Sequence, residues 1–167
     1  MIRVCVAGST GWTGRAVAAA IDASEDLALV AGVSRTGDGD FRSVAEALDA
    51  VPTDVVVDYT HAAVVKENAL AALGRGVALV VGSSGLGADD YDELEALALG
   101  NGVAVVAAGN FSLSAALLLR FATATAARFG TWEVIDYASA TKHARRRRGM
   151  ASRVPVAFVA ETAVAGR

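Results

Sequence analysis

The stretch that decides the fold is VAGSTGWTGRAV, residues 6–17. It begins in a short apolar run, passes through three glycines spaced G-x-x-G-x-x-G, and enters a segment of helical pattern at residues 15–23. A strand that turns through glycines into a helix is typical of the start of a βαβ unit. The glycines permit a tight turn, and the helix start offers unpaired N–H groups and a positive dipole end. The pattern predicts a turn that binds a dinucleotide pyrophosphate; a tight turn without a ligand is the alternative.

Outward from this stretch, strand and helix patterns alternate along the chain. The strand-like runs are nearly continuous in small aliphatic residues, which is typical of a sheet covered on both faces. Their alternation with helices predicts an α/β fold with a doubly wound parallel sheet of Rossmann type. We expect strands at 2–7, 27–33, 55–59, 77–81, 103–107, 132–138 and 154–160, and helices at 15–23, 44–50, 62–73, 89–99 and 112–129.

Composition narrows the class of protein. Hydrophobic residues make up 54% of the 167 residues, which excludes a disordered chain. A net charge of −3 argues against a nucleic-acid binder. Arg120 and Arg128 argue against a membrane span at 112–129. The single cysteine, Cys5, is expected to be a buried, inert thiol. With no separate signal segment visible, we expect a cytoplasmic protein, and we expect no metal site.

The end of the second strand should select the cofactor. An acidic residue there would bind the adenosine ribose of NAD, whereas an arginine would meet the 2′-phosphate of NADP. The sequence at this place is Val33-Ser34-Arg35-Thr36, with no carboxylate. This favours NADPH, with NADH possible; the alternative is that Arg35 is an ordinary solvated loop residue.

Three further strand ends carry small or polar residues. They are Asp58-Tyr59-Thr60-His61, Gly82-Ser83-Ser84-Gly85 and Ala108-Gly109-Asn110-Phe111-Ser112. Ligands of open parallel sheets bind beyond the carboxyl ends of the strands, so the three segments are expected to meet at one edge. Simple turn chemistry is the alternative for each of them taken alone.

These segments, in this order, resemble the 4-hydroxy-tetrahydrodipicolinate reductase (dihydrodipicolinate reductase) family. The resemblance runs from residue 1 to Lys142 and is carried by VAGSTGWTGRAV, VVVDYTHAAVVKENALAALGRGVALVVGSSGL, GNFSLSAALLLRFATATAARF and WEVIDYASATK. The Asp-aromatic-Thr step, the Gly-(Ser/Thr)-(Ser/Thr)-Gly turn and the Asn-Phe-Ser helix entry occur together in that family.

The resemblance implies NAD(P)H-dependent reduction of a small cyclic dicarboxylate to tetrahydrodipicolinate, in lysine (diaminopimelate) biosynthesis. It also implies a dinucleotide-binding domain at 1–111, the start of an α+β substrate and oligomerisation domain at 112–167, and a homotetramer. By position, the residues that would bind the cofactor are Gly8, Ser9, Thr10, Gly11, Trp12, Thr13, Gly14, Ser34, Arg35, Gly82, Ser83, Ser84, Ala108, Gly109, Asn110 and Phe111.

The substrate half departs from the family pattern. After the strand at Glu133 to Asp136, many members have a His-His pair; here Ala138 and Ser139 follow, although Lys142 is kept. The family's Asp-Ala-Pro-Ser-Gly-Thr-Ala loop is replaced by residues 144–151, in which Gly149 is the candidate for the loop glycine. We expect Lys142 to be the catalytic acid and Ser139 and Gly149 to bind substrate. The alternative is a truncated or diverged, non-catalytic NAD(P)-binding homologue.

The run Arg145 to Arg148 has three interpretations. Arginine forks suit a dicarboxylate, so the run could replace the lost carboxylate-binding loop. It could instead contact nucleic acid or another anionic surface, although no aromatic residues are interleaved with it. The third interpretation, which we favour, is a solvated tail that binds nothing specific.

Overall fold

The computed structural model describes residues 1–36, 38–108, 111–126 and 128–129. The chain divides into one unit that covers Met1–Phe111 and a second that begins at Ser112. Each unit is described by itself. The expected strands at 132–138 and 154–160 lie outside the described residues.

The first unit is built on a single five-stranded sheet in the order β2-β1-β3-β4-β5. All neighbouring strands pair in parallel, as the alternating pattern predicts. The order reverses at β1, because the chain adds β2 on one side of it and then crosses back to add β3 on the other. The strands are β1 (Ile2–Ala7), β2 (Leu27–Val33), β3 (Val55–Asp58), β4 (Ala78–Val81) and β5 (Val105–Ala107).

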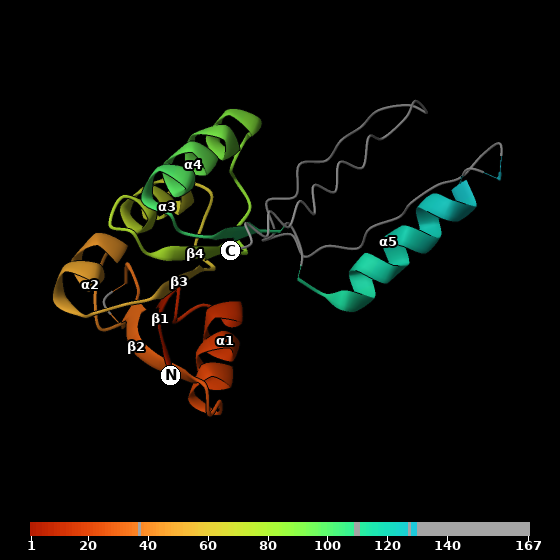
Figure 1. The fold of residues 1–167 in the computed structure, drawn as a ribbon. Coiled ribbons are helices and arrows are strands. Elements are labelled where there is room, and N and C mark those ends of the chain that lie inside the picture. The colour runs from red at the N-terminus through yellow and green to blue at the C-terminus, as the bar shows by residue number, and fades with distance from the viewer. Residues whose placement is uncertain (37, 109–110, 127, 130–167) are drawn as a thin grey trace. The chain divides into compact units, whose positions relative to one another are not determined.

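The alternation of side chains along β1 builds a hydrophobic cluster on each face of the sheet. Cys5 and Ala7 belong to the larger cluster, which is covered by α2, α3 and α4. Val4 and Val6 belong to the smaller one, which α1 covers through Ile21. Helices on both faces make the sheet doubly wound, and Figure 1 shows α1 on the opposite side from α2, α3 and α4. The Rossmann-type fold is therefore confirmed.

The helix bounds show where local capping overrides the apolar pattern. The first helix begins at Trp12 rather than at residue 15, because Gly11 is its N-cap. The third begins at Val65 rather than at 62, because the His61 carbonyl accepts from the N–H groups of Val64 and Val65 in a preceding turn. The helices are α1 (Trp12–Asp22), α2 (Val44–Ala50), α3 (Val65–Leu73), α4 (Ala88–Asn101) and α5 (Leu113–Ala126).

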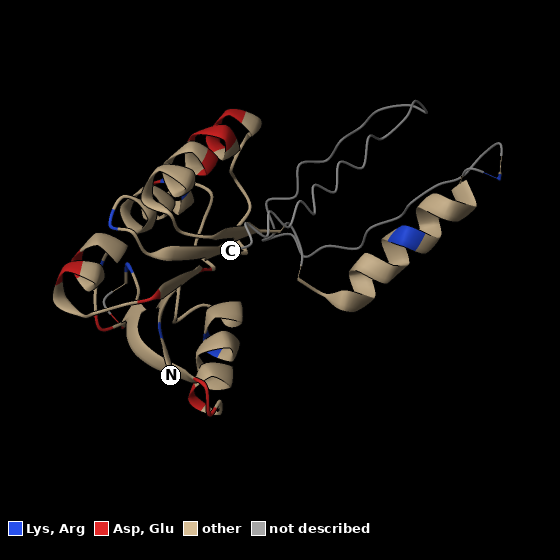
Figure 2. Cartoon of the chain, in the orientation of Figure 1, with Lys and Arg blue, Asp and Glu red and all other residues tan. Residues whose placement is uncertain are grey.

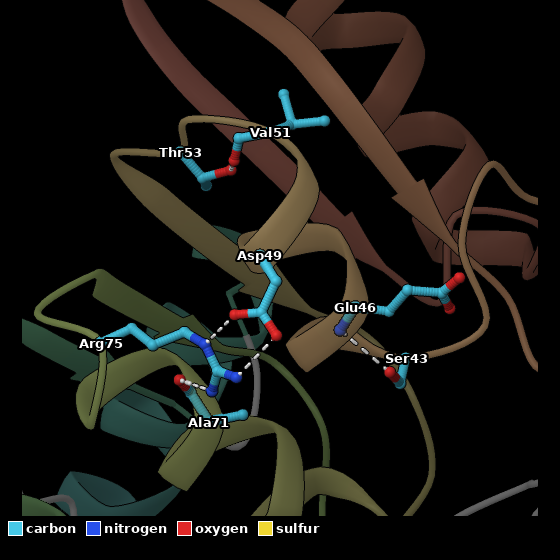
Figure 3. Close-up of polar contacts among 7 residues, drawn as sticks. All are labelled: Ser43, Glu46, Asp49, Val51, Thr53, Ala71 and Arg75. Carbon is cyan, nitrogen blue, oxygen red and sulfur yellow. Dashed lines mark hydrogen bonds and ion pairs between the residues drawn. The ribbon is translucent and has the colours of Figure 1, made fainter.

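Ion pairs join neighbouring helices on the larger face. The guanidinium of Arg75, just beyond α3, donates from Nε to Asp49 Oδ1 of α2 at 2.8 Å and from a terminal nitrogen to Oδ2 at 3.1 Å (Figure 3). Lys66 of α3 reaches Asp90 and Glu93 of α4 at 2.7 and 2.8 Å. Acidic residues gather on the first half of α4 (Figure 2), so Lys66 also offsets part of their mutual repulsion.

Of the second unit, the structure describes chiefly α5. This helix has no buried residue, and Leu113, Leu118 and Phe121 are exposed. Within the ranges that the structure describes, no helix has both the length and the apolar character that a membrane span requires.

Candidate functional site

The glycine loop, residues 8–14, is held against the ends of two strands. The N–H groups of Gly8 and Ser9 donate to the carbonyl of Val33 at the end of β2, at 2.9 and 3.2 Å. Gly8 has φ +83°, and a Cβ at this position would collide with the main-chain carbonyl of Tyr59 beyond β3. Only glycine fits such a left-handed, crowded position. The loop therefore lies at the place where the strand order reverses, beside the ends of β2 and β3.

The first turn of α1 presents unpaired main-chain donors. Its first internal bond runs from Arg15 N–H to the Gly11 carbonyl at 3.0 Å. The N–H groups of Trp12, Thr13 and Gly14 therefore have no partner in the helix, as at any helix start. No side chain caps this end, and the first turn contains no acidic residue. Trp12 and Thr13 are exposed, whereas Gly14 is buried against the Gly8 carbonyl. The helix start can thus offer an anion the exposed donors of its first turn and the favourable end of the dipole.

Hydroxyl groups connect the glycine loop to the end of β2. Thr10 Oγ1 and Ser34 Oγ lie 2.9 Å apart, and Ser34 Oγ lies 2.9 Å from Thr36 Oγ1. Ser34 is buried, whereas the neighbouring Arg35 is exposed. Of the two residues predicted at the adenosine ribose, Ser34 therefore ties the loop to β2, and Arg35 presents its side chain to the surface.

The end of β3 carries a buried carboxylate, Asp58, which was expected among the polar strand ends but was not assigned from the sequence to the cofactor site. Asp58 is completely buried, and Oδ1 accepts from Thr60 N–H and Thr60 Oγ1 at 2.9 and 2.7 Å and from the Ser83 hydroxyl. Oδ2 accepts from Asn68 Nδ2 of α3 at 2.8 Å. Four donors satisfy the carboxylate, which is the condition for burying it. Sequence alone had one signal for it: a charged residue that ends an apolar strand.

The remaining predicted cofactor residues are placed as far as the structure describes them. The 82–85 turn follows β4, with Ser83 half-buried and Ser84 exposed. Ala108 N–H donates to the Val81 carbonyl at 3.1 Å, so this residue still follows the sheet, and Phe111 is exposed. The other predicted site residues, Gly109, Asn110, Ser139, Lys142 and Gly149, lie outside the described residues.

The strands are parallel, so their carboxyl ends meet at one edge. The glycine loop, the residues after β3 and the 82–85 turn share that edge, where the strand order reverses. This is the ligand edge of an open α/β sheet. The unit Met1–Phe111 is therefore a Rossmann-type domain whose ligand edge begins with a glycine-rich helix start.

Comparison with known families specifies this class further. Residues 2–111 match the family described as "Dihydrodipicolinate reductase, N-terminus". The 4-hydroxy-tetrahydrodipicolinate reductase of Nocardia farcinica is 40% identical over 136 residues, which cover 81% of this chain and 52% of that protein. The chain belongs to the dihydrodipicolinate reductase family, a family of oxidoreductases. It spans about half the length of the curated relatives that it matches.

Solved structures agree with the fold. A dipicolinate-bound dihydrodipicolinate reductase from Paenisporosarcina sp. TG-14 superposes with a TM-score of 0.68 at 26% identity, covering 77% of this chain and 55% of the other. GenD2 from gentamicin A biosynthesis, in complex with NAD, gives a TM-score of 0.58 at 25% identity, covering 66% and 35%.

Proposed function

We propose that residues 1–111 form a dinucleotide-binding domain that holds NADPH along the ligand edge of the sheet. The observation that carries the proposal is the start of α1, where the N–H groups of the first turn have no helical partner, no side chain caps the end and no acidic residue stands, beside a crowded glycine turn. A pyrophosphate supplies the negative charge and acceptor oxygens that such a helix start binds. The hydroxyls of Ser9, Thr10 and Thr13 are proposed as further donors; those of Ser9 and Thr10 would have to exchange their present partners, the Val33 carbonyl at 3.4 Å and Ser34 Oγ at 2.9 Å, for the pyrophosphate.

Arg35 is proposed to meet the 2′-phosphate of the adenosine ribose, which makes NADPH the preferred cofactor and NADH a possible second one. Its exposed side chain at the end of β2 supports this role. The nicotinamide half would extend toward the 82–85 turn and residues 108–111. GenD2, which shares the fold, is a complex with NAD.

The proposed reaction is the reduction of 4-hydroxy-tetrahydrodipicolinate to tetrahydrodipicolinate in lysine (diaminopimelate) biosynthesis. Bound NADPH would supply the hydride. Lys142 would stabilise the negative charge that develops on the conjugated ring and donate a proton to it. Ser139 and Gly149 would bind substrate carboxylate within a substrate domain at 112–167, and a homotetramer belongs to the same proposal.

A second candidate function is nucleotide binding without catalysis. It is favoured by the sequence between residues 138 and 151, where neither the histidine pair nor the threonine-containing loop of the family is found. In that case the cofactor half would work as proposed, and no ternary complex with a dicarboxylate would form.

Calorimetric titration separates these functions. The chain is titrated with NADPH and then, once saturated, with pyridine-2,6-dicarboxylate. Binding of both supports the reductase; binding of NADPH alone supports the non-catalytic homologue. If neither NADPH nor NADH binds, the proposed function is wrong.

Enzyme assays test the role of Lys142. With enzymatically generated substrate, Lys142→Ala is expected to lower the rate of NADPH oxidation by about 100-fold or more, the usual worth of a positioned acid. Lys66→Ala is the matched control, because Lys66 pairs with Asp90 and Glu93 on the helical face and its loss should leave the rate unchanged. An unchanged rate for Lys142→Ala would remove this lysine from the mechanism.

A further inference from the structure

The buried carboxylate of Asp58 joins segments that lie far apart in the sequence. Its partners are Thr60 just after β3, Asn68 of α3 and Ser83 of the turn after β4, and Ser83 is 25 residues away along the chain. The main-chain carbonyl of Asp58 adds to this link, because it accepts from Gly82 N–H at 2.9 Å. Hydrogen-bonded networks of this kind, when every member is satisfied, fix the conformation of the groups they join.

The 82–85 turn also packs closely on the residues after β3 at both of its ends. A Cβ at Gly82 would collide with the ring of Tyr59, and one at Gly85 would collide with Ala62. Gly85 adopts φ +126°, a conformation that other residues rarely take. The turn is thus in close contact at both ends, and its centre is attached through Ser83 to Asp58.

The two serines of the turn are engaged differently. The Ser83 hydroxyl donates its proton to Asp58, so it is not available as a donor to a ligand. Ser84 is exposed, and its hydroxyl makes no hydrogen bond to any residue that the structure describes. Attachment of Ser83 to the interior therefore leaves Ser84 as the exposed hydroxyl of the turn.

We propose that Asp58 is a positioning residue, which fixes the 82–85 turn through Ser83 so that Ser84 and the turn's main chain meet the nicotinamide end of the cofactor. This inference rests on the proposed function, since it names which residues shape one half of the cofactor site. Of the two serines predicted to contact the cofactor, Ser83 then anchors the turn to the interior, and Ser84 is the one that faces the ligand.

The test compares two ligands across four variants of the whole chain. NADPH contains the nicotinamide half, and adenosine 2′,5′-bisphosphate does not. Ser83→Ala removes the hydroxyl that links the turn to Asp58. Asp58→Asn weakens the network, because a neutral amide oxygen replaces the charged acceptor and an NH2 group faces Asn68 Nδ2 where Oδ2 accepted. Ser83→Thr keeps a hydroxyl on the same Cβ, and Thr53→Val is the control. Thr53 Oγ1 makes one hydrogen bond of similar kind, to the Val51 carbonyl at 3.0 Å, just before β3 and so at the opposite edge of the sheet (Figure 3).

Ser83→Ala and Asp58→Asn are expected to raise the Kd for NADPH by about fivefold, the worth of one hydrogen bond, and to leave that for adenosine 2′,5′-bisphosphate unchanged. Amide hydrogen exchange should quicken at 59–62 and 82–85 together. Ser83→Thr should restore both measurements toward the original values, and Thr53→Val should alter neither.

Three outcomes overturn the inference. They are an unchanged NADPH affinity in Ser83→Ala, an equal loss for both ligands, and a failure of Ser83→Thr to restore binding. If Asp58→Asn does not fold, the Ser83 pair still decides the matter. If the unaltered chain binds neither ligand, the proposed function fails and the inference falls with it. If the unaltered chain binds both ligands and Ser83→Ala binds them with the same affinities, only the inference is overturned.

Discussion

At the scale of single residues, Cys5 shows how burial controls reactivity. It lies within β1 with no exposed surface, and burial raises the pKa of its thiol to about 12, with smaller effects from the negative charges of Asp40 and Asp58. Because the thiolate is the reactive form, the folded chain should not react with a disulfide reagent at about pH 8. After unfolding in guanidinium chloride, one thiol per chain should react. Rapid labelling of the folded chain would contradict the placement of Cys5.

Asp54 gives a second residue-scale prediction, which concerns acid stability. Hydrogen bonds from the Arg3 side chain, and then from its main-chain N–H, lower the pKa of Asp54 from 3.8 to about 2. A lowered pKa in the folded state means that the ion pair stabilises the fold above about pH 4 and that this contribution is lost as the pH falls toward 2.

The measurement is the melting temperature of the unaltered chain and of Asp54→Asn across this range. The difference between the two should be constant from about pH 7 to pH 5 and should shrink between about pH 4 and pH 2. Both groups are partly exposed, so the difference should also decrease in high salt. A difference that does not change with pH would show that the Arg3 pair does not stabilise the fold.

At the scale of elements, two helical glycines should respond to the same substitution with opposite signs. Gly14, in the first turn of α1, approaches the Gly8 carbonyl so closely that a Cβ would collide with it. At Gly100, near the end of α4, an added Cβ would meet no atom within 4 Å. Gly14→Ala should therefore lower the free energy of unfolding by about 2 kcal/mol, and Gly100→Ala should raise it by about 0.5–1 kcal/mol.

Denaturant titration of both variants measures these changes, and Gly14→Ala should also weaken NADPH binding because the glycine loop must move. Equal effects of the two substitutions would mean that helix propensity alone, and not the close approach of Gly14 to Gly8, determines the stability of the glycine loop.

The elements also show what the sequence can and cannot predict. β1, β2 and α2 have the predicted bounds, because apolar runs and the Ser43 cap are local signals. β5 is shorter than the expected 103–107, because Val103 N–H donates to the Ala98 carbonyl at the end of α4. The starts of α1 and α3 differ from the expected ones for the same kind of reason: caps and turns depend on main-chain geometry that apolar periodicity does not encode.

At the scale of the whole molecule, the ligand edge was only partly predictable. The glycine loop could be identified from adjacent residues, and the parallel topology brings the other strand ends to the same edge. The network around Asp58 could not be identified in this way, because Asn68 and Ser83 reach the carboxylate through tertiary contacts. Residues that bind a ligand through local main chain leave a sequence signal, whereas those that hold that main chain in place leave almost none.

The final prediction concerns which part of the chain can fold alone. Among the residues that the structure describes, every fully buried member of the two clusters lies between Val4 and Ala98, and helix α5 contributes no buried residue. A chain that ends at Phe111 should therefore keep its core, melt cooperatively within about 5 °C of the full chain, and bind NADPH with the same affinity. Calorimetric melting and titration of the two chains test this together.

Because about 1 kcal/mol shifts the melting temperature of a domain of this size by several degrees, a melting temperature lowered by more than about 10 °C would mean that residues after Phe111 stabilise the sheet substantially. A cooperative melt with lost NADPH binding would instead place essential cofactor contacts after Phe111, and the assignment of the cofactor site to residues 1–111 would be wrong.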